Sequence, residues 1–225
     1  MKALLFEKEL TYHEHYPDPA PPAGEVLIRV LYAGICTTDL EIMQGYMGFS
    51  GIASHEFVGL VAGPDDSPWC GKRVVGEINC GCGACARCRS GDQRHCPERT
   101  VLGIEGRNGA FAEYLLLPED RLHEVPPGLT DEEAVFTEPC AAACRILEQV
   151  APLPDRVLVI GDGKLGLLLA QVLAGSCEVH LLGHHCGRAK QVCGEGVTIL
   201  ETSPENERFS AVVEASGSAS GLADA

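Results

Sequence analysis

The stretch DRVLVIGDGKLGLLLAQVLAG, from Asp155 to Gly175, decides the fold of the second half of the chain. A short apolar run over residues 157–160 leads into a glycine-rich turn, and an apolar segment of helical length follows. The turn has the pattern G-x-G-x-x-G, which between a strand and a helix predicts a dinucleotide-binding Rossmann unit. The glycines allow a tight turn, and the helix N-terminus offers unpaired N–H groups to phosphates. We expect cofactor contacts from Gly161, Gly163, Lys164, Leu165 and Gly166. A turn that holds no ligand is the alternative.

The residue that follows the next strand, over residues 178–182, bears on the choice of dinucleotide. An acidic residue about 20 positions after the glycines would bind the adenosine ribose hydroxyls and favour NAD. The sequence has Gly183 there, followed by His184, His185 and Arg188. A small residue with cationic neighbours accommodates a 2′-phosphate, so the sequence favours NADP and names Gly183 and Arg188 as cofactor contacts. NAD, with the histidines as solvated loop residues, remains the alternative.

The rest of the pattern divides the chain into two domains, residues 1–150 and 151–225. After "APLPD" strands and helices alternate, with helices near 164–175 and 187–193 and strands at 178–182, 197–200 and 211–214, which predicts a parallel sheet. Before it, short β runs with Pro and Gly breaks lie at 2–6, 25–34, 56–63, 72–78 and 109–117, as in an all-β barrel. Thr130 and Glu133 are spaced as a capping box for a helix from Asp131, and a second helix is expected over 139–150.

Four cysteines in the first half follow the spacing Cys82-x2-Cys85-x2-Cys88-x7-Cys96. Four thiolates at these steps can fill a closed tetrahedral shell, which is typical of a structural zinc site. An iron–sulfur cluster is the alternative, but the x7 step and the lack of a second cluster motif disfavour it. Cys80 falls outside the spacing, and we interpret it as a plain buried thiol.

Composition and charge exclude several function classes. The formal net charge of −15 disfavours binding to a nucleic-acid backbone. The apolar runs are shorter than the roughly 20 residues of a membrane span, and the N-terminal sequence has no long apolar core of an export signal. We therefore expect a cytoplasmic protein, in whose reducing surroundings clustered cysteines bind metal rather than form disulfides.

A second set of ligand types is spread over the first domain. Cys36 ends one strand-like run, His55 and Glu56 open another, and Glu138 stands beside Pro139 at the expected start of a helix. Sulfur, imidazole and carboxylate are the ligands of an open, catalytic zinc site. Each residue alone is weak evidence, since single histidines and cysteines are more often merely packed.

Five ordered segments, "GICTTDLEI", "HEFVGLV", the cysteine lobe, "GAFAEYLLLP" and "GDGKLG", resemble the zinc-dependent medium-chain dehydrogenases/reductases, the alcohol, sorbitol and threonine dehydrogenase relatives. The resemblance implies an α+β two-domain fold, in which a GroES-like β-barrel catalytic domain precedes a Rossmann domain that is only partial here. It further implies one catalytic and one structural zinc. Two departures are visible, because Ser54 replaces the usual Gly before the histidine, and Glu41 replaces a frequent histidine of the proton relay.

The resemblance also implies roles for single residues. Cys36, His55 and Glu56 would bind the catalytic zinc, with Glu138 bound directly or through water. Thr38 and Glu56 would be catalytic, Thr38 by passing on the proton of the substrate hydroxyl, although Thr38 could be only a turn residue. Asp39 would orient a ligand such as His55, or merely cap a turn.

The resemblance implies hydride transfer between an alcohol or polyol and NAD(P), with a ketone or aldehyde as the oxidised partner. Relatives continue beyond the fourth Rossmann strand, so we expect a fragment or a chain with a different closure, and a homo-oligomer in the full-length form. A non-catalytic zinc-binding scaffold and a redox sensor are the rival hypotheses. The sensor would use the thiols outside the zinc motifs, which are Cys70, Cys80, Cys140, Cys144, Cys177, Cys186 and Cys193.

Overall fold

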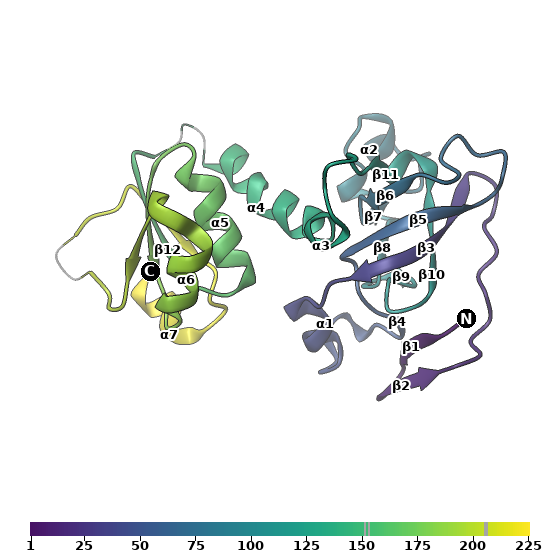
Figure 1. Cartoon of the computed structure of the whole chain (residues 1–225), viewed down its shortest axis with the longest axis horizontal. Helices are drawn as coiled ribbons and strands as arrows, with labels where there is room; N and C mark the ends of the chain where they lie inside the picture. The colour runs from purple at the N-terminus through teal and green to yellow at the C-terminus, as the bar shows by residue number, and fades with distance from the viewer. Residues whose placement is uncertain (151, 153, 205–206) are drawn as a thin grey trace. The chain divides into compact units, whose positions relative to one another are not determined.

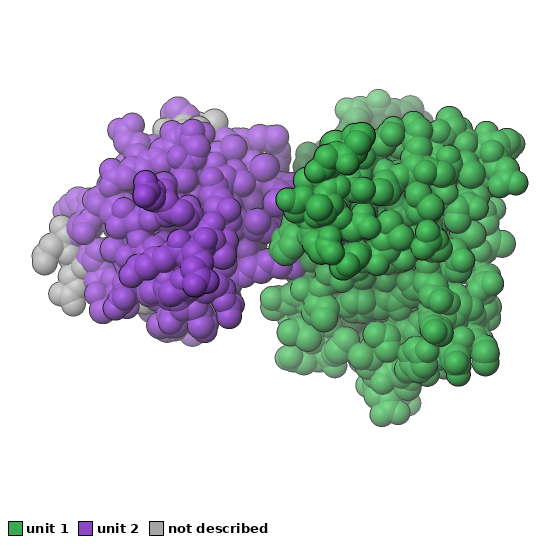
Figure 2. Space-filling view, viewed as in Figure 1, with its two compact units in different colours: residues 1–138 green, residues 139–225 purple. Residues whose placement is uncertain are grey.

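The computed structural model describes residues 1–150, 152, 154–204 and 207–225. The chain forms two compact units, Met1–Glu138 and Pro139–Ala225 (Figure 2). The sequence placed the domain limits at 1–150 and 151–225, and residue 151 lies outside the described residues, so those limits stay a prediction. No helix in the described ranges has the length and apolar character that a membrane crossing requires.

Unit 1 is built from three small β-sheets (Figure 1). The largest is antiparallel, in the order β10 (Tyr114–Pro118), β3 (Glu25–Ala33), β5 (Phe57–Gly63), β6 (Arg73–Gly76) and β11 (Leu122–Glu124). A second has the order β2 (Leu10–His13), β1 (Ala3–Phe6) and β4 (Gly51–Ile52), and a third joins β7 (Asn79–Cys80), β8 (Thr100–Leu102) and β9 (Gly106–Arg107). The strand-like runs of the sequence correspond to β1, β3, β5, β6 and β10, which confirms the all-β prediction for this part.

Alternating side chains of these strands fill the core of unit 1. Val26 and Ile28 of β3 are fully buried, and they pack with Val61, Val74 and Leu117 in one cluster. Alternation arises because successive side chains of a strand point to opposite faces of the sheet. The buried face therefore fixes the register of β3, whose carboxyl end leads directly to Cys36.

Short helices occupy the connections of unit 1, namely α1 (Thr37–Ile42), η1 (Tyr46–Gly48), α2 (Ala86–Arg89), η2 (Gln93–His95), η3 (Glu119–Arg121) and α3 (Asp131–Ala134). The predicted capping box is confirmed, since Thr130 Oγ1 accepts from the Glu133 amide at 3.2 Å and Glu133 Oε2 accepts from the Thr130 amide at 2.9 Å.

Helix α4 (Thr137–Gln149) starts earlier than the sequence suggested. The predicted start was Pro139, with Glu138 in front of the helix, but Glu138 lies inside the first turn. Proline is tolerated at the third helical position because the first four N–H groups of a helix have no intrahelical acceptor. The start position predicted from Pro139 was therefore wrong by two residues.

Unit 2 is a parallel sheet with helices, as predicted. Its strand order is β14 (Val197–Leu200), β13 (Glu178–Leu182), β12 (Arg156–Ile160) and β15 (Ala211–Glu214). All three pairings are parallel, and helices α5 (Lys164–Ala174) and α6 (Cys186–Cys193) pack on β12, β13 and β14. The short helix η4 (Gly194–Gly196) lies between α6 and β14, and α7 (Ala219–Asp224) follows β15. The carboxyl ends of β12 and β13 face the same edge, where the glycine-rich turn begins.

Candidate metal and dinucleotide sites

Cys36, His55 and Glu56 come together in unit 1. The Cys36 sulfur, a ring nitrogen of His55 and a carboxylate oxygen of Glu56 all lie within 4.8 Å of one another. Cys36 precedes α1, and His55 and Glu56 precede β5, so two connections converge on one point. His55 and Glu56 are buried, being 4% and 3% exposed.

The chemistry of this group fits a zinc ion. The Nδ1 atom of His55 is buried and has no hydrogen-bond partner among the described residues. An unsatisfied buried nitrogen is unfavourable unless something binds it, and a metal ion can do so. One sulfur, one nitrogen and one carboxylate are three protein ligands, which leave a fourth zinc position open.

Glu138 is not a member of this group. The described His, Cys, Asp and Glu side chains that gather closely enough to hold a metal form two groups, and Glu138 belongs to neither. It lies in the first turn of α4, at the last position of unit 1. Its role as a zinc ligand therefore stays a prediction.

Asp39 ties the two ligand-bearing connections together. It is fully buried, its Oδ2 accepts from the Cys36 amide at 2.8 Å, and its Oδ1 accepts from the Ser54 amide at 2.9 Å. The sequence suggested that Asp39 orients the His55 ring or caps a turn. Its carboxylate caps α1 through the amide of the ligand Cys36, and it also binds the amide of Ser54, the residue before His55.

Ser54 explains why a glycine is usual before the histidine. Its φ is +74°, a left-handed conformation that is uncommon for residues with a side chain. The Ser54 hydroxyl donates to the Gly34 carbonyl at 3.0 Å, which offsets part of this strain. Its own carbonyl accepts from the Ala110 amide at 2.9 Å. The departure from glycine is thus compatible with the same backbone path.

Gly34 leaves the room in which the Glu56 carboxylate lies. A Cβ atom at position 34 would stand 2.2 Å from Glu56 Oε2, and the Gly34 amide donates to the Glu56 carbonyl at 2.8 Å. We expect Gly34→Ala to displace the carboxylate and to weaken zinc binding at this site about 10- to 100-fold, as when a metal ligand loses its support. Competition with a chelator measures this. Gly128→Ala, whose added Cβ meets no atom within 4 Å, is the control and should leave the zinc affinity unchanged. An unchanged zinc affinity in Gly34→Ala would refute a role for the close approach of Gly34 to Glu56.

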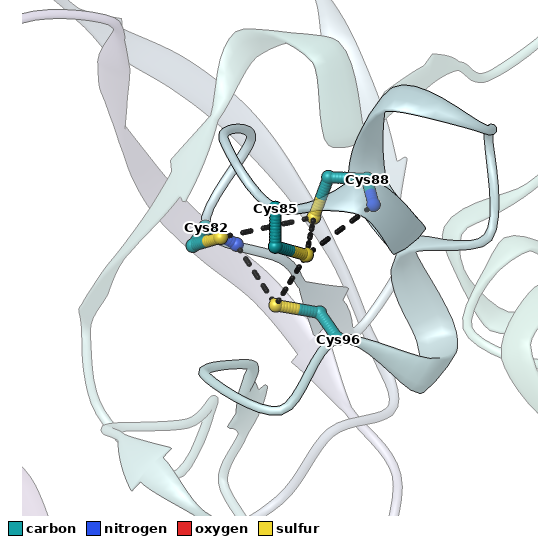
Figure 3. A group of neighbouring side chains, drawn as sticks. All are labelled: Cys82, Cys85, Cys88 and Cys96. Atoms are coloured by element: carbon teal, nitrogen blue, oxygen red, sulfur yellow. Dashed lines mark hydrogen bonds between the residues drawn. The ribbon is translucent and has the colours of Figure 1, made fainter.

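The four spaced cysteines form the second group, as shown in Figure 3. The sulfur of Cys85 lies 3.5 Å from that of Cys88 and 3.8 Å from that of Cys96, and the sulfurs of Cys82 and Cys88 are 4.0 Å apart. Cys80 lies on β7 outside the group, as the spacing indicated. All cysteines of the chain are free thiols. Four sulfurs at these separations surround a space suited to a tetrahedral ion.

The electrostatics of the tetrad also fit a cation. Backbone N–H groups of Ala84 and Cys85 lower the pKa of Cys82 to about 7. Burial, with the neighbouring thiols, raises the pKa of Cys88 to about 12. Four adjacent thiolates repel one another, and a divalent cation removes that repulsion and favours their ionised forms. The four cysteines are therefore arranged more favourably with a bound metal ion than without one.

The glycine-rich turn of unit 2 fits a dinucleotide. Gly161 has φ +110°, and a Cβ on Gly166 would lie 1.8 Å from the Gly161 carbonyl oxygen, so both positions require glycine. A Cβ on Gly163 would meet no atom within 4 Å, which leaves that side open to a phosphate. Lys164 and Leu165 begin α5, whose N-cap Gly163 has no capping side chain. Arg188 is exposed on α6.

Comparison with known proteins identifies the family. The model of the alcohol dehydrogenase GroES-like domain matches residues 22–127. The chain is 35% identical over 188 residues to the starvation-sensing protein RspB of Escherichia coli K12, a match that covers 80% of this chain and 55% of RspB. It is 34% identical to a sorbitol dehydrogenase of Halalkalibacterium halodurans, covering 76% and 53%. Residues 22–127 thus belong to the alcohol dehydrogenase GroES-like domain family, and the chain as a whole is similar to medium-chain dehydrogenases/reductases. It spans about half the length of these curated relatives.

Solved structures of the family share the fold. RspB from E. coli CFT073, in complex with NADH, superposes with a TM-score of 0.83 at 29% identity, covering 96% of this chain and 69% of that one. A zinc-binding dehydrogenase of Sinorhizobium meliloti, bound to NADP, gives 0.79 at 26% identity, covering 98% and 71%. The predicted two-domain fold, a GroES-like barrel with a partial Rossmann domain, is thereby confirmed.

Sequence reasoning missed two residues that shape these sites, Gly34 and Asp162, and noted Ser54 only as a departure from the usual glycine. Gly34 acts through contacts with Glu56, a residue distant in sequence, for which the sequence carries no signal. Asp162 is different, because it lies inside the glycine pattern itself, between Gly161 and Gly163. An acidic residue at that position was the available signal.

Proposed function

We propose that the complete protein is a zinc-dependent oxidoreductase that transfers a hydride between an alcohol or polyol and a nicotinamide dinucleotide. The group formed by the half-buried sulfur of Cys36 and the buried side chains of His55 and Glu56 carries this proposal. A glycine-rich turn of dinucleotide type on the same chain supports it. So do relatives that are named dehydrogenases.

Cys36, His55 and Glu56 would hold the catalytic zinc, with Glu138 as a proposed further ligand. Bound zinc would lower the pKa of a substrate hydroxyl. Thr38 would accept and pass on the proton, and the 3.7 Å distance between its Oγ1 and the Cys36 sulfur supports this role. Glu56 contributes a negative charge beside the same point. Asp39 keeps these side chains in register by binding the backbone that carries them. Cys82, Cys85, Cys88 and Cys96 would hold the structural zinc.

The substrate class follows from the ligand set. A carboxylate in the zinc group resembles the polyol and threonine branch of the family more than the branch with two cysteine ligands. Curated relatives include a sorbitol dehydrogenase and an L-threonine 3-dehydrogenase at 34% and 33% identity. We therefore propose a secondary alcohol with a neighbouring hydroxyl or amino group, oxidised to the ketone.

Zinc content of the purified chain and of a Cys36→Ser variant tests this proposal. We expect about two zinc ions per chain in the wild type and about one in the variant, because one site is closed and one is open. Cys70→Ser, which removes an exposed thiol elsewhere, should leave the content unchanged. If the wild type holds about one ion that Cys36→Ser does not affect, the open site does not form and the non-catalytic scaffold is favoured.

A further inference from the structure

The sequence has no acidic residue directly after β13, but the carboxylate of Asp162 lies at that place in the structure. A Cβ atom at Gly183 would lie 2.3 Å from Asp162 Cγ and 2.5 Å from Asp162 Oδ2. The room that an acidic side chain at position 183 would enter is therefore filled by the carboxylate of Asp162, which reaches it from the glycine-rich turn. Asp162 is buried, with 7% of its surface exposed.

The Asp162 carboxylate is held from the loop that follows β13. Its Oδ2 accepts from the backbone amide of His185, and its Oδ1 lies 3.2 Å from His185 Nδ1. Burial raises the pKa of Asp162, but the hydrogen bonds from His185 outweigh burial, so the net pKa lies below its usual value and the group is ionised near neutral pH. Each carboxylate oxygen can accept a further hydrogen bond.

The position of this carboxylate matters because of the sheet. Ile160 of β12 pairs with Leu182 of β13, and the Gly161 amide donates to the Leu182 carbonyl at 2.8 Å. Asp162 and Gly183 thus stand at adjacent carboxyl ends of parallel strands. In dinucleotide-binding sheets this is where an acidic residue binds the adenosine ribose, and where NADP instead places its 2′-phosphate.

We propose that Asp162 makes this unit select NAD over NADP, by accepting from the ribose hydroxyls and repelling a 2′-phosphate. The inference rests on the proposed function, because it assumes that the turn binds a dinucleotide. A hydroxyl can donate to a carboxylate, whereas a phosphate dianion cannot donate and meets a like charge at short range.

The nearby cations, which favoured NADP in the sequence, count for less in the structure. The ring of His185 is engaged by Asp162. His184 and Arg188 are exposed, so water screens their charge. The buried carboxylate, in contrast, lies where the side chain at position 183 would be.

Isothermal titration calorimetry of the 225-residue chain with NADH and with NADPH tests the inference. We expect NADH to bind at least about tenfold more tightly, a difference of about 1.4 kcal/mol. Asp162→Asn keeps the shape of the side chain but removes its charge. It should therefore reduce the ratio of NADH affinity to NADPH affinity, mainly by strengthening the binding of NADPH. Asp155→Asn, at the opposite end of β12, removes one charge from the same unit and should leave the ratio unchanged. Arg188→Ala should weaken NADPH binding less than twofold.

The outcomes separate this inference from the proposed function. If neither dinucleotide binds, the proposed function fails. If NADPH binds as tightly as NADH, or if Asp162→Asn melts normally and keeps the wild-type ratio, the role of Asp162 is refuted while the proposed function stands. If Asp162→Asn does not fold, the wild type is titrated with 5′-AMP and with 2′,5′-ADP, which carries the 2′-phosphate. Weaker binding of 5′-AMP than of 2′,5′-ADP would overturn the inference.

Discussion

A Cys88→Ser chain will lose about one zinc ion, and its cysteine lobe, residues 80–99, will open to proteases. Cys88 is 8% exposed and its sulfur contacts two others of the tetrad. Binding of structural zinc by small zinc-finger peptides contributes about 10–16 kcal/mol, which is folding free energy where little else orders the chain. The lobe has only α2, η2 and the short strands at its base, so a bound zinc ion would supply most of its order.

Limited digestion with trypsin measures this opening, because the lobe carries its own cleavage sites, Arg87, Arg89, Arg94 and Arg99. Cleavage at these residues should rise at least about tenfold in Cys88→Ser and in zinc-stripped wild type, since local opening limits cleavage. Cys80→Ala is the matched control, because it removes a buried thiol of β7 from outside the tetrad. Equal cleavage of Cys88→Ser and Cys80→Ala, with equal zinc content, would contradict a structural metal in the lobe.

The parallel sheet of unit 2 was predictable because its strands are short, continuous apolar runs. The predicted ranges 178–182, 197–200 and 211–214 coincide with β13, β14 and β15. In β12 and β13 four of the five residues are buried, so burial and β propensity give the same answer, whereas the edge strands β14 and β15 are only partly buried. Unit 1 was less predictable at the residue level. Strand β2 and the strands of the β7–β8–β9 sheet are short and carry little periodicity, and β7 pairs with β8 across the intervening cysteine-rich stretch, Asn79 opposite Val101.

For the candidate sites, the sequence indicated the ligands but not the residues that position them. Ligand types and cysteine spacing indicated two metal groups, and the structure brings together Cys36, His55 and Glu56 as well as the four cysteines. What positions these ligands could not be read from the sequence. Gly34 and Glu56 meet because β3 pairs with β5, and Asp162 fills the space at Gly183 because β12 pairs with β13. Strand register, which is a tertiary property, decides both contacts.

Removal of the Asp39 carboxylate should have the second largest effect. In Asp39→Ala the amides of Cys36 and Ser54 lose their acceptor in a buried place. An unsatisfied buried donor costs about 1–3 kcal/mol, so two of them lower the stability of unit 1 by several kcal/mol. At about 2–4 °C per kcal/mol in a protein of this size, the melting temperature should fall by roughly 10 °C.

The same substitution should also empty the open zinc site before it affects the closed one. Asp39 binds the backbone of both connections, at Cys36 and at Ser54 beside His55, so the loss of its carboxylate would let the connections move apart and spread the ligands. We expect about one zinc per chain in Asp39→Ala, with trypsin resistance of the cysteine lobe unchanged. Asp66→Ala, an exposed acid of unit 1, should behave as wild type. Loss of both zinc ions together would show that Asp39 supports unit 1 as a whole, whereas retention of both would show that the ligands hold their places without it.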